Sequence, residues 1–187
     1  MLAHQGAGQQ ARPRSKAAAP LLYLATLTVG LMAGFFFSFA ILVMPSLAKV
    51  DDRAFVVSMQ KINEGVQNGG FMFAFLGAFV FTGAAAIVHH RAGYRTAARW
   101  ILAATLLYVV ALALTFSGNI PLNNKLAGAG DPAVIADFAA ARAAFDEGTW
   151  NFLNAARTIA CMLSLLALVP AIALHGRANK ALKTGIS

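Results

Sequence analysis

Four side chains near the start of the last apolar segment share one face of a helix. Trp150, Asn154, Arg157 and Cys161 stand at positions i, i+4, i+7 and i+11, which places them on one stripe. A guanidinium beside an amide can hold an oxyanion, and an indole can stack on flat rings. The alternative is an arginine that snorkels to the membrane surface beside an interfacial tryptophan.

Amide side chains are frequent in the two segments expected on the same side of the membrane. They are Gln60, Asn63, Asn68, Asn119, Asn123 and Asn124. Amides donate and accept hydrogen bonds with a ligand, although asparagine also favours turns. Together with the stripe around Arg157, they point to a binding site at this end of the molecule.

Several other chemistries find no support in the sequence. His4, His89, His90 and His175 are expected at the inner side or at inner helix ends, and His89-His90 is interpreted as a solvated helix end rather than a metal site. Cys161 is the only cysteine, so the chain has no intrachain disulfide and no multi-cysteine metal site. No P-loop, dinucleotide fingerprint or nucleophile elbow occurs. Carboxylates are missing from the apolar segments, which argues against a proton-coupled transporter.

The elements that must position these residues are transmembrane helices. The chain is 59% hydrophobic and 12% charged, where a soluble domain carries about 25% charged residues. Four uncharged runs, at about 21–44, 71–88, 100–116 and 158–174, approach or exceed the length that crosses a bilayer. We therefore predict an all-α, four-transmembrane-helix bundle over residues 20–176, with short helices in its two outer loops. A disordered leader (1–19) and a basic tail (177–187) complete the chain.

The charges predict which way the chain crosses the membrane. The leader, the link between spans two and three, and the tail hold nine basic residues and no acid, whereas all seven acids lie in the other loops. The positive-inside rule then places both termini in the cytoplasm, in the inner (cytoplasmic) membrane. The net charge of +8 is thus interpreted as a topology signal and not as a nucleic-acid site.

Smaller patterns predict the packing and the loops. Gly30, Gly34 and Ser38 form a small-residue stripe that lets helices approach closely, either inside the bundle, which we favour, or in a homo-oligomer. Pro45 is expected to end or kink the first span. The first outer loop (46–70) is expected to hold an amphipathic helix capped by Asp51 or Asp52. In the second outer loop, residues 117–132 are predicted to be irregular and 132–145 helical, with Asp131 as the helix cap.

The pieces MQKIN (59–63), NIPLNNKL (119–126), WNFLNAAR (150–157) and GFFFSFAILVMPSL (34–47) resemble the anthrone-oxygenase-like family of small four-helix membrane proteins. The resemblance extends from about residue 21 to 175. The resemblance implies a membrane bundle. The fungal members of the family are associated with oxidation of an anthrone to an anthraquinone by O2 without metal or flavin. Most bacterial members are described only as a domain of unknown function. No cofactor is therefore expected.

The resemblance and the chemistry together select the candidate residues. Arg157, Asn154 and Asn123 are candidate catalytic residues that would hold the oxyanion of an anthrone enolate. The candidate substrate-binding residues are Trp150, Asn119, Asn63 and Gln60. Asp146 or water would have to serve as the base. The alternative function is non-catalytic: the chain binds a lipid or hydrophobic small molecule there, or acts as a partner subunit, and the same residues clamp the loop.

Overall fold

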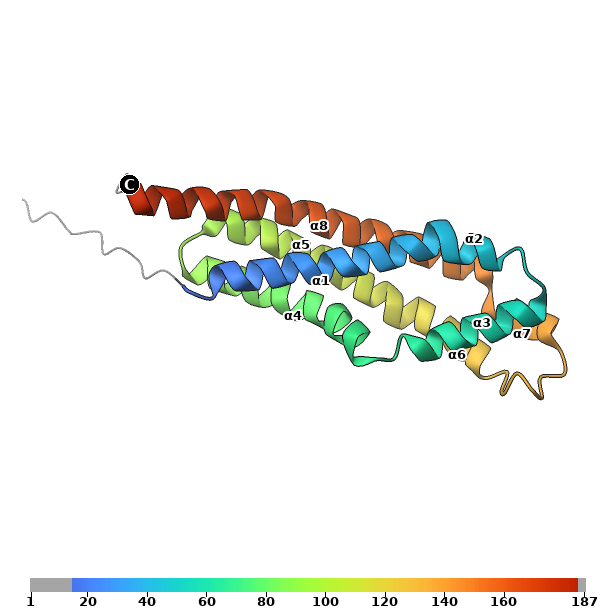
Figure 1. Ribbon diagram of the computed structural model, residues 1–187. Helices are drawn as coiled ribbons and strands as arrows, with labels where there is room; N and C mark the ends of the chain where they lie inside the picture. The colour runs from blue at the N-terminus through green and yellow to red at the C-terminus, as the bar shows by residue number, and fades with distance from the viewer. Residues whose placement is uncertain (1–14, 185–187) are drawn as a thin grey trace, which may run out of the picture.

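The computed structural model describes residues 15–184, and this part of the chain is all-helical, with no strand. The main helices are α1 (Ala18–Ser38), α4 (Gly69–Arg91), α5 (Arg95–Leu114) and α8 (Glu147–Thr184). They lie side by side in Figure 1, and the first and last described helices begin and end at the same end of the bundle. The predicted fold class is confirmed. The leader predicted to be disordered was 1–19: residues 1–14 lie outside the described residues, and residues 18 and 19 belong to α1.

Four helical stretches of the described chain are long and apolar enough to cross a membrane: 18–47, 69–91, 95–127 and 138–178. Each contains one of the four runs predicted from the sequence. α1 packs on α4 and α8, and α5 packs on α4 and α8, so the helices form a ring in chain order. Large apolar side chains such as Leu27, Ile41 and Leu106 face outward, as lipid-facing residues do.

The bundle core pairs its polar groups internally. Tyr108 is fully buried and donates its hydroxyl to the Phe75 carbonyl at 2.8 Å. Ser164 Oγ donates to the Ala104 carbonyl at 2.8 Å, which joins α8 to α5. Both bonds join two helices within the apolar core. An unpaired hydroxyl there would cost free energy, because no water could replace its partner.

Two π-helical segments extend the bundle beyond its apolar core. Segment η1 (Phe39–Val43) joins α1 to α2 (Met44–Leu47), and η2 (Thr115–Asn119) joins α5 to α6 (Ile120–Ala127). Each π segment ends two residues before a proline, Pro45 or Pro121. Proline removes a backbone donor and crowds the preceding turn, and a wider turn accommodates this without breaking the helix. The expected end or kink at Pro45 is therefore a π turn followed by more helix.

The second outer loop differs from its prediction at two places. Residues 120–127, expected to be irregular, form α6. The helix expected from Pro132 begins only at Phe138, as α7 (Phe138–Phe145), because Asp137 and not Asp131 caps it by accepting from the Ala140 amide. The Asp131 carboxylate instead accepts from the Ala133 amide at 2.8 Å and closes a local turn.

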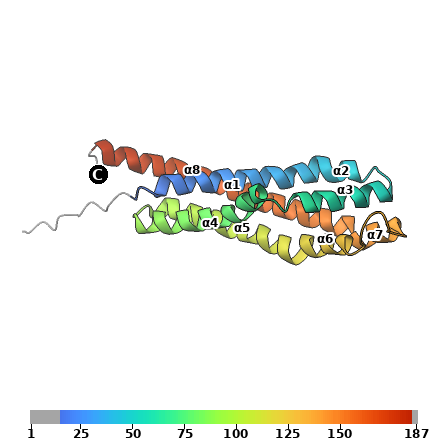
Figure 2. The ribbon, with the colours of Figure 1, turned by 60° about the horizontal axis from the view of Figure 1, so that its bottom comes forward.

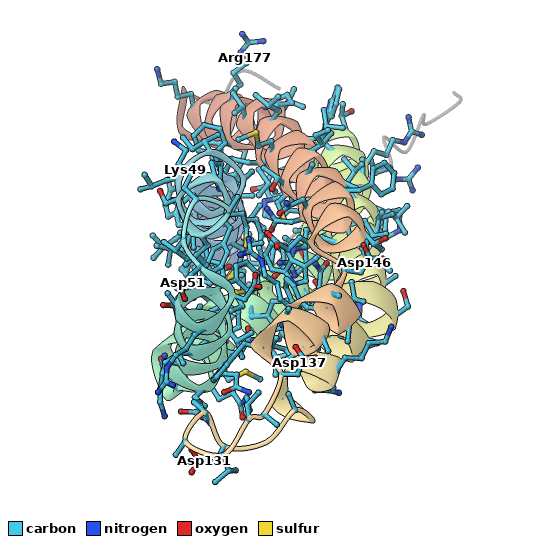
Figure 3. All side chains as sticks on the ribbon, turned by 90° about the vertical axis from the view of Figure 1, so that its right-hand side faces the viewer. Lys49, Asp51, Asp131, Asp137, Asp146 and Arg177 are labelled. Carbon is cyan, nitrogen blue, oxygen red and sulfur yellow. The ribbon has the colours of Figure 1, made fainter. Side chains whose placement is uncertain are left out.

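A helical cap covers this end of the bundle. α3 (Asp52–Gly65) is capped by Asp51, one of the two caps predicted, and packs against α6 and α7 (Figure 2). Arg142 of α7 bonds Asp52 at 3.1 Å and pairs with Glu147 of α8, so three helices share one guanidinium. Figure 3 looks onto this end, around which Asp51, Asp131, Asp137 and Asp146 lie.

Two interpretations made from the sequence are wrong for some of their residues. Gly34 and Ser38 are exposed, and a Cβ added at Gly34 meets nothing within 4 Å, so this part of the stripe does not pack inside the bundle. His89 is fully buried rather than solvated, and its Nε2 lies 3.2 Å from His175 Nδ1. The pair forms because α4 and α8 end side by side, which the sequence of either helix alone does not reveal.

Candidate functional site

A cavity of about 780 Å³ lies between the bundle and its helical cap, within the size range of small-molecule sites. Its walls come from α1 and η1, α3, α4, η2 and α6, and the start of α8. Aromatic side chains supply most of the apolar wall: Phe35, Phe36, Phe39, Phe71, Phe75, Phe116 and Trp150. Such a wall suits a flat hydrophobic ligand, because ring faces and edges pack well against one another.

Arg157 projects from α8 into this aromatic wall and is 6% exposed. Its Nη1 lies 3.4 Å from Thr115 Oγ1. Its Cζ lies 4.2 Å from the ring centroid of Phe36 and 5.2 Å from that of Trp150. Among the described residues no carboxylate pairs with it, so ring faces and neutral oxygens are what surround the cation. Its burial excludes the snorkelling alternative.

Asn154 holds Arg157 in place and does not line the cavity. Its Oδ1 accepts from Arg157 Nε at 3.1 Å, and its Nδ2 donates to the Phe36 carbonyl at 3.1 Å, in the last turn of α1. Both ends of the amide are therefore engaged. These two contacts position Arg157 against α1. Donation by Asn154 to a substrate oxyanion stays a prediction.

Trp150, Asn123 and Asn119 are joined by hydrogen bonds across the cavity wall. Trp150 Nε1 donates to Asn123 Oδ1 at 2.8 Å, and Asn119 Nδ2 donates to the Trp150 carbonyl at 3.2 Å. A carbonyl can only accept, so this bond fixes the orientation of the Asn119 amide. The sequence-predicted neighbours of Arg157 are thus brought together, but Asn123 bonds Trp150 and not Arg157.

Asn119 carries an acceptor with no partner. Asn119 is fully buried, lines the cavity, and its Oδ1 makes no hydrogen bond to the described residues. A buried acceptor without a donor costs about 1–3 kcal/mol. Oδ1 has almost no accessible surface, so a ligand hydroxyl supplies the missing donor only once the cavity wall moves. The site therefore offers a cation at Arg157 and, behind the cavity surface, an acceptor at Asn119 that has no donor among the described residues.

The two candidates on α3 have different positions. Gln60 is buried, and its Nε2 donates to the carbonyls of Leu126 at 2.9 Å and Gly130 at 3.2 Å, which ties α3 to the end of α6 and the loop after it. Asn63 is half-buried and lines the cavity near its mouth. Gln60 thus shapes the cavity by holding its cap in place.

Carboxylates reach the cavity only at its mouth. Asp146, expected as a base, does not line the cavity; it caps α8 by accepting from the Thr149 amide at 3.1 Å, with a left-handed φ of 53°. The lining carboxylates are Glu64 and Asp131. Glu64 lies 2.8 Å from Lys61 Nζ, and this hydrogen bond raises the pKa of Lys61. Glu64 and Asp131 are therefore the acids that could exchange protons with a bound molecule.

Sequence reasoning missed the partners that other helices bring to Arg157. Thr115 stands at the start of η2 and accepts from Arg157 Nη1 at 3.4 Å. Phe36 comes from α1. The proline two residues beyond η2 was the available sequence signal, because a proline after an apolar helix can mark a π turn, and π turns are frequent at functional sites.

The comparisons with known proteins identify the family. A family model described as anthrone oxygenase matches residues 71–167, just over half of the chain, from the start of α4 to the middle of α8. No curated protein and no solved structure matches the chain. The matched segment contains Asn119, Asn123, Trp150 and Arg157, and the four apolar helices are those of a multi-pass membrane protein. The chain belongs to the anthrone oxygenase family.

Proposed function

We propose that this protein is a membrane oxygenase that oxidises an anthrone-like hydroxylated aromatic ketone with O2 in the 780 Å³ cavity, without a cofactor. One observation carries the proposal. The buried Arg157, with no carboxylate partner among the described residues, and the unsatisfied acceptor Asn119 Oδ1 line the same aromatic cavity. A flat molecule with one ionisable oxygen and one hydroxyl complements all three features.

The reaction follows from the acidity of the anthrone CH2 group. Loss of one proton gives an enolate, whose oxygen accepts from the Nη groups of Arg157. The carbanionic carbon transfers its electron pair to O2 and forms a C–O bond, which gives a hydroperoxide after protonation. Loss of water leaves a carbonyl, so that CH2 and O2 become C=O and H2O. Electrons and atoms balance without a further reductant.

The protein residues act on charge and position. Arg157, which is itself 6% exposed, stabilises the oxyanion, and one charge-assisted hydrogen bond is worth about 1.5–3 kcal/mol. Asn119 Oδ1 accepts from a substrate hydroxyl, and Trp150 covers the rings. The proton leaves toward the mouth, where Glu64 and Asp131 are the lining carboxylates. The cavity then faces away from the cytoplasm, if the arginine-rich end of the bundle lies inside.

The test is turnover of an anthrone by the purified protein in detergent, followed by quinone absorbance and by O2 consumption. Wild type should exceed the rate without protein, and Arg157→Gln should lose at least tenfold. Arg177→Gln is the matched control, because Arg177 is exposed and lies near the opposite end of the same helix, α8 (Glu147–Thr184). A wild-type rate equal to the rate without protein refutes the oxygenase proposal for that substrate.

A second candidate function is binding without turnover. It is favoured by one observation: among the residues that the structure describes, the only carboxylates that line the cavity are Glu64 and Asp131, and no histidine lines it, so the base must be one of these exposed acids or water. In this case a hydroxyanthraquinone would quench the fluorescence of Trp150, while an anthrone would consume no O2 above background. Quenching together with turnover favours the oxygenase instead.

A further inference from the structure

A second cavity of about 510 Å³ lies between α4 and α5, at the end of the bundle opposite the large cavity. Its floor is apolar and consists of Ala86 and Ile87 from α4 and Ala98 and Leu102 from α5. The floor lies on the outer surface of a transmembrane bundle. An apolar groove in that position is open to the hydrocarbon chains of lipids.

Positive side chains line the end of the groove where the chain passes from α4 to α5. They are Arg91, Arg95 and Arg99, with His90 beside them. All four are exposed. The three ion pairs among the described residues involve none of them, and each includes Lys61 or Arg142 of the capping helices. This end of the groove therefore carries a positive charge that no described carboxylate neutralises.

Helix geometry explains why cations and apolar residues share one groove. On α5, Arg95, Ala98, Arg99 and Leu102 stand at i, i+3, i+4 and i+7, which is a single stripe. The arginines occupy the first turn and Leu102 lies about 10 Å further along the axis. On α4 the sequence order is reversed: the apolar Ala86 and Ile87 come first, and His90 and Arg91 come last. Because α4 ends where α5 begins, the cations of both helices lie at the same end of the groove, and the rest of the groove is apolar.

We propose that this groove binds an anionic phospholipid, with its phosphate on Arg91, Arg95 and Arg99 and one acyl chain along the apolar floor. Arginine binds phosphate oxygens through a planar fork of donors, and basic pockets between transmembrane helices recognise anionic headgroups. The apolar floor favours a lipid over free phosphate. The choline of a zwitterionic lipid would place a second cation beside the arginines. The proposal does not depend on chemistry in the large cavity.

A role in topology alone does not account for the groove. The positive-inside rule counts basic residues near the ends of spans and does not require that they converge on one stripe. Arg177 illustrates the difference, since it is exposed at the same end of the molecule but does not line the groove. It supplies a matched control.

The experiment measures lipid affinity by native mass spectrometry of the full chain in detergent, with thermal unfolding as a second readout. The probes are dioleoyl phosphatidylglycerol, dioleoyl phosphatidylcholine and inorganic phosphate. Phosphatidylglycerol should bind wild type at least tenfold more tightly than phosphatidylcholine, and phosphate alone should not raise the melting temperature. Arg95→Gln/Arg99→Gln should weaken phosphatidylglycerol about thirtyfold, at about fivefold for each arginine.

Three results would overturn the proposal. Equal affinity for the two lipids, equal stabilisation by phosphate, or an equal loss in Arg177→Gln would each show that no specific lipid site exists. Circular dichroism checks that each variant is folded. If Arg95→Gln/Arg99→Gln is not, Arg91→Gln/Arg99→Gln replaces it with the same expectation. Leu102→Asn tests the floor and should weaken phosphatidylglycerol while the arginines stay intact.

Discussion

Replacing Asn154 with aspartate should cancel the charge of Arg157 while keeping its contact. Asn154 Oδ1 already accepts from Arg157 Nε at 3.1 Å, so a carboxylate oxygen would take the same position as an ion-pair partner. An oxyanion held by the Nη atoms would lie about 6 Å from that carboxylate, and at an effective dielectric of about 20 their repulsion is roughly 3 kcal/mol. Binding of an anion should fall about a hundredfold.

The assay compares two ligands of the same shape in Asn154→Asp. A hydroxyanthraquinone is measured as its phenolate, and unsubstituted anthraquinone is neutral. The chain has two tryptophans, so a Trp100→Phe background leaves Trp150 as the reporting indole. The dissociation constant of the anion should rise about a hundredfold, and that of the neutral ligand should change little. Turnover of an anthrone should fall with anion affinity, because both use the same oxyanion contact.

Asn154→Leu is the control, because it also removes the bond to the Phe36 carbonyl but leaves Arg157 charged. Its loss of anion affinity should stay near tenfold, the value of one hydrogen bond to a charged group. If Asn154→Asp binds the anion and turns over substrate within threefold of wild type, the positive charge of Arg157 is not used. The mechanism derived above would then be wrong.

Three further predictions concern the residues that shape the cavity and its cap, and a glycine that faces outward. Asn119→Leu removes an unsatisfied buried acceptor together with one bond, so the melting temperature should change little, while kcat/KM for a hydroxylated substrate should fall about tenfold relative to a substrate lacking the hydroxyl. Gly118→Ala places a Cβ 2.5 Å from Leu153 Cδ1, so the half-buried Leu153 side chain must move. Gly34→Ala meets no atom within 4 Å and should gain about 0.5–1 kcal/mol from helix propensity. Gly118→Ala should therefore be the less stable of the two variants in thermal unfolding. Arg142→Gln loses two ion pairs that join α3, α7 and α8, so the cap should become less stable. Limited proteolysis measures this: cleavage within 138–145 should become faster while the bundle core stays resistant.

The membrane core could be predicted from the sequence because lipid permits few solutions. Only a helix pairs its backbone internally within one segment, so four long uncharged runs predict four helices. The stripe of α8 followed from helical periodicity, and Trp150, Asn154, Arg157 and Cys161 are all buried as expected of one inward face. Local rules therefore gave the spans and the part of the site that lies on one helix.

The remaining features depend on contacts between helices or on how a helix tolerates proline. Asn119-Ile120-Pro121 reads locally as a turn, yet the adjacent apolar helix continues through it by a π turn. The role of Asn154 depends on a carbonyl of α1, more than a hundred residues away in the chain. No pattern within one segment encodes such a pairing. Asp146 was a plausible base by position but is used as a helix cap.

The two π turns also change the direction in which the helix faces point on either side of them. Each adds roughly one residue to a helical turn, which rotates everything beyond it by about 100° relative to the helix below. Two diagonally opposite helices of the bundle, α1–α2 and α5–α6, carry this offset, each just before its proline, Pro45 or Pro121. The orientation of the side chains at the capping end is thus set separately from that of the side chains in the membrane core. Deleting one residue from η2 would leave the packing of α5 in the membrane core unchanged and would turn the face that carries Asn119 and Asn123 away from Arg157. Sequence changes between η2 and the end of the cap can therefore reshape the cavity without repacking the membrane core.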